Sequence, residues 1–272
     1  MSQAREGPRD RAPVDHANAA PGRFVPAACG ADLADYAGVA RDRGCSPRTS
    51  RHRQEAIISA DKASSWVYAE EFLPEDEVLL AARERAAQLG ASTVTPGTGA
   101  VLTLLAAASK ARAAVEIGTG TGVASLYLLR GMPADGVLTT IDSELEHHRA
   151  AKESFADAGI RSTRTRTISG RPLDVLPRLT DAAYDLVLLS LTSTGGLLDS
   201  APEYLAQSLR LLRPGGVLVI DHALWHDRVA DPARRDEATT VVRELGRAVR
   251  ADDRLQPALL PVGDGVLAAV RR

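Results

Sequence analysis

Short apolar runs recur along most of this chain and alternate with amphipathic segments. The runs have the length of buried β-strands, whereas the segments between them repeat apolar residues at helical spacing. The predicted strands are Ala113–Ile117, Val137–Ile141, Arg164–Ile168, Tyr184–Leu189, Val217–Ile220, Ala258–Val262 and Gly265–Val270. Strands that alternate with helices favour a mostly parallel, doubly wound α/β sheet with helices on both faces, a three-layer arrangement. A tight turn at Gly263 and Asp264 adds one antiparallel strand, which completes a seven-stranded sheet.

Helix limits are predicted from capping residues and helix breakers. Ser143–Glu146 has the sequence of a capping box, so a helix is expected to begin there and to end near Ala158. Pro74 suits the first turn of an earlier helix that Gly90 ends, and Thr95–Gly99 is interpreted as a turn before an Ala- and Leu-rich helix. The other predicted helices cover residues 122–130, 173–179, 202–212 and 233–250.

Residues 1–55 differ in composition from the rest of the chain. They are rich in Ala, Arg, Asp, Pro and Gly and poor in Leu and Ile, so they bury too little apolar surface to offset the entropy lost on ordering. We expect a disordered leader over 1–55 and one folded domain over 56–272. Within that domain, N-terminal helices are expected over 56–110 and the sheet with its helices over 111–272.

Composition and charge exclude several classes of function. The chain is 44% hydrophobic and 25% charged, with a net charge of −2 and a pI near 6.3, so it lacks the basic face that nucleic-acid binding needs. No apolar run approaches the roughly 18 residues of a membrane span, and the N-terminus lacks the apolar core of a signal peptide. Cys29 and Cys45 have no histidine at zinc spacing and are interpreted as free thiols of a cytoplasmic protein.

A glycine-rich turn follows the first predicted strand. Gly118, Gly120 and Gly122 leave backbone N–H groups open to a ligand at the start of a helix. Asp142 lies 20 residues past Gly122 at the end of the second predicted strand, where a carboxylate can accept both hydroxyls of a ribose. This spacing indicates a site for a nucleoside cofactor. The alternative is a tight turn that binds no ligand.

The spacing of the glycines distinguishes two cofactors. Dinucleotide sites use Gly-x-Gly-x-x-Gly, but Val123 stands at the sixth position, which disfavours an NAD-dependent oxidoreductase. Glu116 stands two residues before the first glycine and completes the pattern acid-x-Gly-x-Gly-x-Gly. This pattern resembles motif I of class I S-adenosylmethionine (SAM)-dependent methyltransferases. A carboxylate is favourable beside the positively charged sulfonium and ammonium groups of SAM.

Five stretches between residues 64 and 272 together resemble the small O-methyltransferases of the catechol and caffeoyl-CoA type, particularly actinobacterial members. They are Val115–Gly122, Leu138–Asp142, Tyr184–Leu189, Leu212–Ile220 and Pro261–Gly265. The resemblance implies the Rossmann-like class I methyltransferase fold, SAM as cofactor, a small-molecule acceptor and a homodimer.

The resemblance also implies roles for residues of the cofactor site. Asp142 would bind the ribose hydroxyls with Ser143 beside the adenine, and Val94 would contact the methionine moiety through its backbone. The family's serine for the methionine carboxylate is replaced by Ala124, with Ser125 next to it. The other implied contacts are Glu116, Gly118, Thr119, Gly120 and Gly122 near the amino-acid end, Gly170 and Arg171 at the edge of the adenine, and Ser190.

The chain departs from this family at the metal site. Family members hold a divalent cation with an aspartate after the fourth strand and an Asp-Asn pair after the fifth, and they use a nearby lysine as general base. The corresponding residues here are Ser190, the pair Asp221-His222, and Ser193, so one of three ligands is kept and the lysine is lost. We therefore expect the usual Mg²⁺ site to be lost or weakened, because this cation needs several oxygen ligands.

His222 is the candidate for a replacement base. It follows the fifth predicted strand, at the sheet edge where ligands bind, and Asp221 would orient it. Two alternatives stay open: a softer metal held by Asp221, His222 and His226, or histidines that contact only water. His147 and His148 are expected on a solvated helix face. The predicted function is SAM-dependent O-methylation of a small hydroxylated molecule; its rival is a non-catalytic SAM-binding protein with a sensing or scaffold role.

Overall fold

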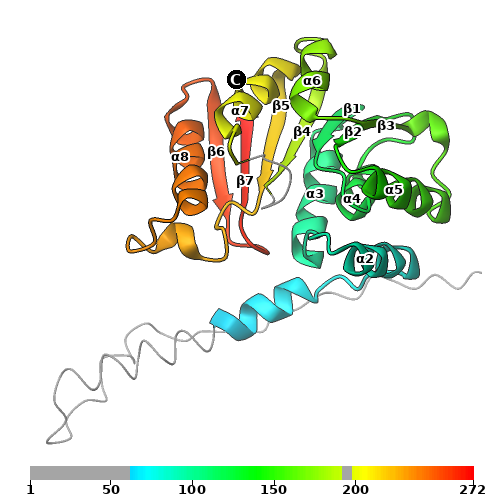
Figure 1. Cartoon of the computed structure of the whole chain (residues 1–272), viewed down its shortest axis with the longest axis horizontal. Helices are drawn as coiled ribbons and strands as arrows, with labels where there is room; N and C mark the ends of the chain where they lie inside the picture. The colour runs from blue at the N-terminus through cyan, green and yellow to red at the C-terminus, as the bar shows by residue number, and fades with distance from the viewer. Residues whose placement is uncertain (1–61, 192–197) are drawn as a thin grey trace, which may run out of the picture. The chain divides into compact units, whose positions relative to one another are not determined.

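Figure 1 shows the computed structural model of the protein. It describes residues 62–191 and 198–272, which belong to one unit spanning Gln54–Arg272. The predicted leader over 1–55, with both cysteines, and Ser193 at the position of the family's lysine lie outside the described residues.

A seven-stranded sheet forms the centre of the described residues. Its strands are β1 (Ala113–Ile117), β2 (Val137–Asp142), β3 (Thr165–Ser169), β4 (Tyr184–Ser190), β5 (Leu212–Asp221), β6 (Leu255–Leu260) and β7 (Val266–Arg271). Their spatial order is β3-β2-β1-β4-β5-β7-β6, and within this sheet β7 alone runs antiparallel to its neighbours. The strand order reverses between β1 and β4, which is where open α/β sheets bind ligands. The predicted doubly wound sheet with one antiparallel strand is confirmed.

Both faces of the sheet are apolar. Successive residues of a strand point to opposite faces, and in β1 Val115 and Ile117 join one buried cluster whereas Ala114 joins the other. This pattern is expected for parallel strands that helices cover on both sides. Glu116 is in phase with Ala114 and is a fully buried acidic residue within this strand.

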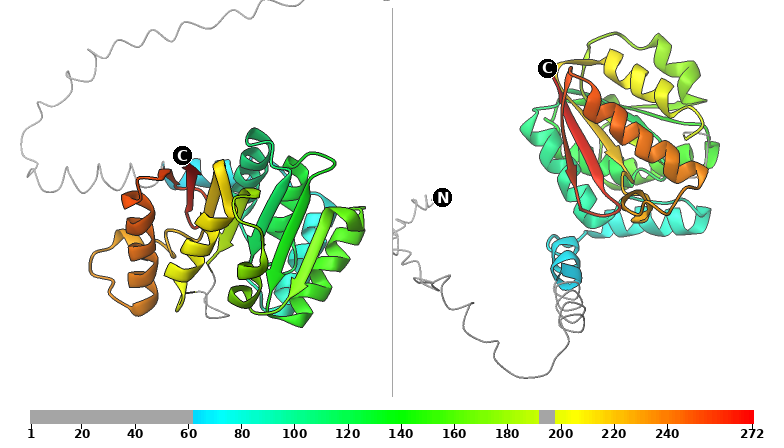
Figure 2. Two further views of the ribbon diagram at one scale, coloured as in Figure 1. Left: turned by 90° about the horizontal axis from the view of Figure 1, so that it is seen from above. Right: turned by 90° about the vertical axis from the view of Figure 1, so that its left-hand side faces the viewer.

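Helices cover the two faces in two groups (Figure 1, Figure 2). One group packs on the cluster that contains Val115 and consists of α6 (Pro172–Val175), α7 (Ala201–Leu211) and α8 (Glu237–Ala251). The other packs on the cluster that contains Ala114 and consists of α2 (Glu77–Leu89), α3 (Pro96–Ala108), α4 (Val123–Gly131) and α5 (Leu145–Asp157). Short 3₁₀ turns lie at Ser162–Arg164, Leu176–Arg178 and Arg228–Ala230, and residues 62–70 are also helical. The predicted three-layer arrangement is therefore present.

Three helices begin elsewhere than predicted. Helix α8, predicted from residue 233, begins at Glu237, where the Asp236 side chain accepts a hydrogen bond of 3.0 Å from Thr239 N. Helix α2 begins at Glu77 and not at Pro74, because the Asp76 side chain caps it by accepting a backbone hydrogen bond of 3.1 Å. Helix α3 begins at Pro96, inside the predicted turn, with Thr95 as its N-cap. In all three cases a capping side chain, and not the preceding loop composition, fixes the first turn.

The predicted capping box at Ser143 is wrong. Glu144 is the N-cap of α5 and makes no side-chain capping bond. Its backbone N–H donates instead to Asp142 Oδ1 at 2.9 Å. Asp142 thus ends β2 and also organises the entry into α5, which ties this carboxylate to the backbone on both sides of the turn.

Strand β5 is longer than predicted. Tyr184 pairs with Leu212 and Leu186 pairs with Val217, so Arg213–Gly216 forms an irregular insertion within the strand and not a turn before it. Gly215 has φ +77°, a left-handed conformation that favours glycine and lets the chain bulge.

Glu70 connects the helix at 62–70 to the rest of the described chain through hydrogen bonds. Its buried carboxylate accepts hydrogen bonds from the backbone N–H of Gly97 (2.8 Å) and of Gly263 (2.7 Å). One side chain therefore connects the first turn of α3 with the turn between β6 and β7.

Close packing of α3 on α4 gives a stability prediction. A Cβ at Gly131 would lie 2.2 Å from the Thr103 carbonyl oxygen and 2.9 Å from the Ala106 Cβ, so Gly131→Ala must force the two helices apart. We expect a loss of about 1–3 kcal/mol in unfolding free energy, measured by urea denaturation. The control is Gly246→Ala in α8, where the same methyl group meets nothing within 4 Å. It should stabilise the helix by about 0.5–1 kcal/mol, and equal stability of the two variants would contradict the packing.

Candidate functional site

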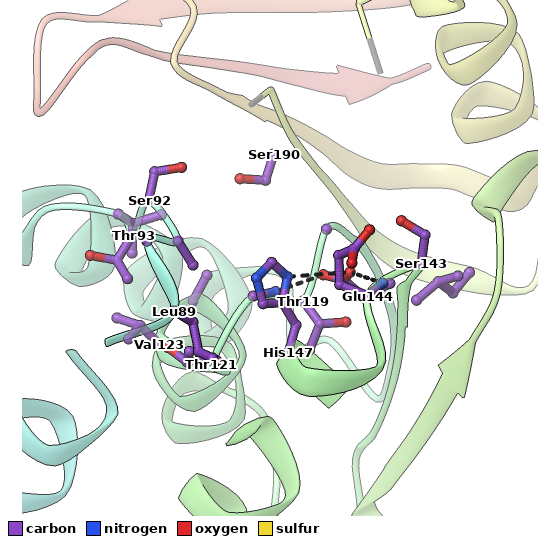
Figure 3. A pocket seen from close by; sticks show the side chains of 18 of the residues that line it. Leu89, Ser92, Thr93, Thr119, Thr121, Val123, Ser143, Glu144, His147 and Ser190 are labelled. Atoms are coloured by element: carbon purple, nitrogen blue, oxygen red, sulfur yellow. Dashed lines mark hydrogen bonds and ion pairs between the residues drawn. The ribbon is translucent and has the colours of Figure 1, made fainter. Parts of the chain in front are cut away.

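A pocket of about 340 Å³ opens at the carboxyl ends of β1, β2 and β4. Figure 3 shows Thr119 of the glycine-rich turn, Ser143 and Glu144 after β2, and Ser190 at the end of β4 around this space. Residues 89–94, between α2 and α3, form the opposite wall. The pocket therefore lies beside the point at which the strand order reverses.

The glycine-rich turn has a backbone that other residues rarely adopt. The φ angles of Gly118, Gly120 and Gly122 are +93°, +51° and +87°. The N–H of Gly120 donates to Asp142 Oδ2 at 2.9 Å. A Cβ at Gly122 would approach the Phe155 ring to 3.0 Å, so this glycine permits α4 to pack on α5. Gly118 and Gly120, by contrast, line the pocket.

Asp142 joins the turn after β1 to the start of α5. Its Oδ2 accepts from Gly120 N and its Oδ1 accepts from Glu144 N, both at 2.9 Å. The residue is 8% exposed, and that remainder lies in the pocket. A carboxylate has about four lone-pair sites, so about two remain for a ligand.

Glu116 is the centre of a buried polar network beneath the turn. Its Oε2 accepts from Ser125 Oγ and from Thr140 Oγ1, the latter at 2.6 Å, and Thr140 Oγ1 lies 2.6 Å from Thr119 Oγ1. Burial raises the pKa of Glu116 to about 7, a shift that the two hydroxyl bonds reduce and the charge of Asp142 increases. Glu116 therefore exchanges its proton near neutral pH.

We expect Glu116→Gln to change how stability depends on pH. An acid with a pKa of about 7 in the folded state and 4.5 as its model value contributes stability that is fully present below pH 4.5 and is lost as the pH rises through 7. As the pH rises from about 4.5 to 8, the unfolding free energy of wild type should fall relative to that of the variant by up to about 3 kcal/mol. Urea denaturation of both proteins at the two pH values measures this shift. The same pH dependence of stability in Glu116→Gln and wild type would contradict this expectation. The exposed control Glu146→Gln should keep the pH dependence of wild type.

The pocket brings together part of the predicted cofactor site. It is lined by Val94, Gly118, Thr119, Gly120, Ala124, Asp142, Ser143 and Ser190. The predicted contacts Glu116, Gly122, Ser125, Gly170 and Arg171 do not line it. Ser125 is fully buried and donates to Glu116, so its hydroxyl is not directed to the pocket. Pro172 contributes to the wall near which Gly170 and Arg171 were expected.

Asp221 and His222 lie one strand away from this pocket and do not line it. Asp221 ends β5 in register with Ser190 of β4. His222 Nδ1 lies 2.8 Å from Asp221 Oδ2, although the two groups are not aligned as a hydrogen bond. Burial lowers the pKa of His222, but the neighbouring Asp221 carboxylate and the charge of Asp264 outweigh burial and raise it above its ordinary value.

The loop after β5 has an unusual backbone. Left-handed φ angles between 51° and 60° occur at His222, Trp225, His226 and Asp227. The turn between β6 and β7 holds this loop, because the Asp264 carboxylate accepts a hydrogen bond from the N–H of His226 (2.5 Å) and the Asp264 carbonyl oxygen accepts one from the N–H of Leu224 (2.8 Å). Non-glycine residues in this conformation store strain, which often marks functional loops.

The donors at the family's metal position do not fit a divalent cation. Within 62–191 and 198–272, no group of three or more His, Cys, Asp or Glu side chains is arranged to hold a metal. Ser190 offers a hydroxyl, Asp221 one carboxylate, and His222 faces that same carboxylate. The His226 side chain is 67% exposed and lies 3.5 Å from Asp264, so it does not join Asp221 and His222.

Several pocket residues could not be identified from the sequence. They are Leu89–Thr93, Thr121, Val123, Ile141, Glu144, His147 and Pro172. The solvated position expected for His147 is wrong: its half-buried side chain lines the pocket, with Nδ1 3.4 Å from Asp142 Oδ1. The available signal was its spacing, since a residue five positions after Asp142 falls in the first turn of a helix that starts at the pocket.

Comparison with known proteins identifies the family. The O-methyltransferase family model matches residues 63–272. The chain belongs to the O-methyltransferase family. It is 52% identical over 208 residues to a Mycobacterium bovis protein that carries the same family name, and the match covers 76% of the chain and 91% of the relative.

Solved structures of related proteins agree with this O-methyltransferase fold. A protein from Corynebacterium glutamicum is 33% identical with a TM-score of 0.68, and the match covers 75% of this chain and 94% of that one. TomG from Streptomyces achromogenes, an O-methyltransferase of tomaymycin synthesis solved in complex with SAM, is 30% identical with a TM-score of 0.66. That match covers 76% of this chain and 96% of TomG. Among the described helices of this chain, none has the length and apolar character to cross a membrane.

Proposed function

We propose that this member of the O-methyltransferase family transfers a methyl group from SAM to a hydroxyl oxygen of a small molecule. The observation that carries the proposal is one pocket that combines the open backbone of the glycine-rich turn with the Asp142 carboxylate on the next strand. This combination suits a nucleoside with two free hydroxyls. The SAM bound to TomG supports the choice of cofactor.

The residues of the pocket suggest an orientation for the cofactor. We assign the ribose to Asp142, the adenine to the wall with Ser143, and the methionine moiety to Val94 and the glycine-rich turn. When bound, SAM supplies an electrophilic methyl group on a positively charged sulfur. Buried Glu116 Oε1 has no hydrogen-bond partner among the described residues, which suits a site that gains positive charge. Ala124, in contrast, provides no hydroxyl for the methionine carboxylate.

We further propose that His222 is the general base and that no divalent metal takes part. Asp221 raises the pKa of His222 against the effect of burial, so the imidazole is a stronger base than an ordinary histidine. With Nδ1 facing Asp221, Nε2 is the nitrogen that would accept the proton of the acceptor hydroxyl. Holding the acceptor hydroxyl and the cofactor methyl group in line would lower the activation barrier for methyl transfer by about 7–11 kcal/mol.

The rival function is a SAM-binding protein without catalytic activity. It is favoured by Ser190 at the family's ligand position and by the location of Asp221 and His222 outside the pocket. A panel of phenolic and hydroxylated acceptors with methyl-labelled SAM separates the two functions. We expect transfer that persists in EDTA. Transfer that needs added Mg²⁺ would contradict the metal-free mechanism, and SAM binding without transfer to any acceptor would favour the rival.

We also propose a homodimer in the cytoplasm that uses neither nucleic acid nor membrane. The family resemblance and the net charge of −2 support this assignment. Trp66, Tyr68 and Phe72 are 45%, 70% and 65% exposed near the first described helix, which suits burial against a second copy. Light scattering should give twice the mass of the chain; a monomer at micromolar concentration would contradict the dimer.

A further inference from the structure

His147 lies against the carboxylate to which we assign the ribose. It is the third residue of α5, and its side chain is 19% exposed. Figure 3 shows the imidazole projecting into the pocket from α5, between Leu89 and Glu144. Its Nδ1 lies 3.4 Å from Asp142 Oδ1, an ion-pair distance when the imidazole carries a proton.

The acceptor sites of Asp142 are limited. Backbone N–H groups of Gly120 and Glu144 already use one lone-pair site on each oxygen. About two sites remain, one on each oxygen, which is the number that two ribose hydroxyls need. A protonated His147 beside Oδ1 takes up one of these sites and neutralises the charge that attracts the hydroxyl protons.

We propose that His147 is a proton-sensitive positioning residue of the cofactor site, whose protonated imidazole competes with one ribose hydroxyl for Asp142. The cofactor then binds more weakly at acidic pH and displaces a proton on binding. This inference rests on the proposed function, because it presupposes that a ribose binds at Asp142. It adds to that function a link between cytoplasmic acidity and cofactor occupancy.

Some charges around His147 favour the protonated form of its imidazole and others disfavour it. Asp142 and Glu144, the other ionisable residues that line the pocket, favour the protonated imidazole. The N-terminus of α5 disfavours it, because the helix dipole is positive there. The facing wall, from Leu89 to Val94, carries no charged side chain. On the same helix, His148 has a pKa lowered by burial and by Lys152 and does not line the pocket.

The test is the binding of S-adenosylhomocysteine (SAH) and of adenosine to the full chain at an acidic pH of about 5.5 and a basic pH of about 8.5. Calorimetry of wild type, His147→Gln and the matched control His148→Gln gives the affinities. We expect wild type and His148→Gln to bind both ligands about fivefold more weakly at acidic pH, the range for a partly exposed ion pair. His147→Gln should lose this difference. Adenosine has no amino-acid moiety, so it does not reach the end of the site that we assign to Glu116. The remaining charge interaction between Glu116 and Asp142 is common to wild type and both variants, so the comparison between them removes it.

Each outcome is decisive. Equal pH dependence of adenosine binding in wild type and His147→Gln would overturn the role of His147 while leaving SAM binding intact. Loss of the pH dependence in His148→Gln as well would also overturn it, because the effect would then not be specific to the pocket. Failure of wild type to bind SAH at either pH would overturn the proposed function itself, and the inference with it.

Discussion

Asp142→Asn is expected to weaken SAH binding by about a hundredfold or more. The carboxylate accepts hydrogen bonds from Gly120 N and Glu144 N, and we assign it two more from the ribose. An amide can accept on one side only, so it loses hydrogen bonds to a charged group that are each worth about 1.5–3 kcal/mol. A total loss of about 3 kcal/mol corresponds to roughly a hundredfold in dissociation constant. Isothermal titration of SAH into the variant measures it.

The control for this variant is Asp135→Asn. Asp135 pairs with Arg112 on the surface, and its side chain is 60% exposed, so the same chemical change is made away from the pocket. We expect wild-type affinity and near-wild-type thermal stability in the control. Asp142→Asn should fold but be less stable, because its amide oxygen can accept from only one of the two backbone N–H groups. An unchanged SAH affinity in Asp142→Asn would mean that the nucleoside binds elsewhere.

His222→Gln is expected to lower kcat by about 10²–10⁴ while the KM for SAM changes little, because the side chain lies outside the cofactor pocket. In wild type, kcat should rise with pH as the imidazole loses its proton. The midpoint of this increase should lie above the ordinary histidine pKa of about 6.5, since Asp221 and Asp264 raise the pKa of His222 against the effect of burial. The variant should lack this part of the pH profile. Steady-state kinetics across pH, with labelled SAM, provides the measurement.

His226→Gln serves as the control for this second variant. His226 lies in the same loop and also has a left-handed backbone conformation, but its side chain is 67% exposed and faces Asp264. Its kcat and pH profile should match those of wild type. Full activity of His222→Gln, or an equal loss in both variants, would remove His222 from the role of general base.

The sheet could be predicted closely where local sequence determines it. The limits of β1 at Ala113–Ile117 follow from an apolar run that ends at Gly118, and the structure has the same limits. The start of β5 could not be found in this way. The pairing of Leu212 with Tyr184 depends on a strand far away in sequence, and the insertion at Arg213–Gly216 looks locally like a turn. Propensity is thus overridden by tertiary pairing.

The candidate site also has residues that could be predicted from the sequence and residues that could not. Gly118, Gly120 and Asp142 stand at the ends of adjacent strands, so their convergence follows from the topology alone. The wall at residues 89–94 comes from the end of α2 and reaches the pocket only through helix packing, which no local motif records. Ser125 illustrates the opposite error: it is close to the motif in sequence, but its hydroxyl turns inward to Glu116.

Binding of SAM at the glycine-rich turn is the basis of every functional assignment above. Equilibrium dialysis of the full chain against labelled SAM, in the presence of EDTA, tests it most directly. We predict saturable binding of one SAM per chain that unlabelled SAH displaces and that Asp142→Asn abolishes over the same concentration range. Absence of saturable binding by the wild-type chain, or saturable binding that Asp142→Asn leaves unchanged, would contradict the account.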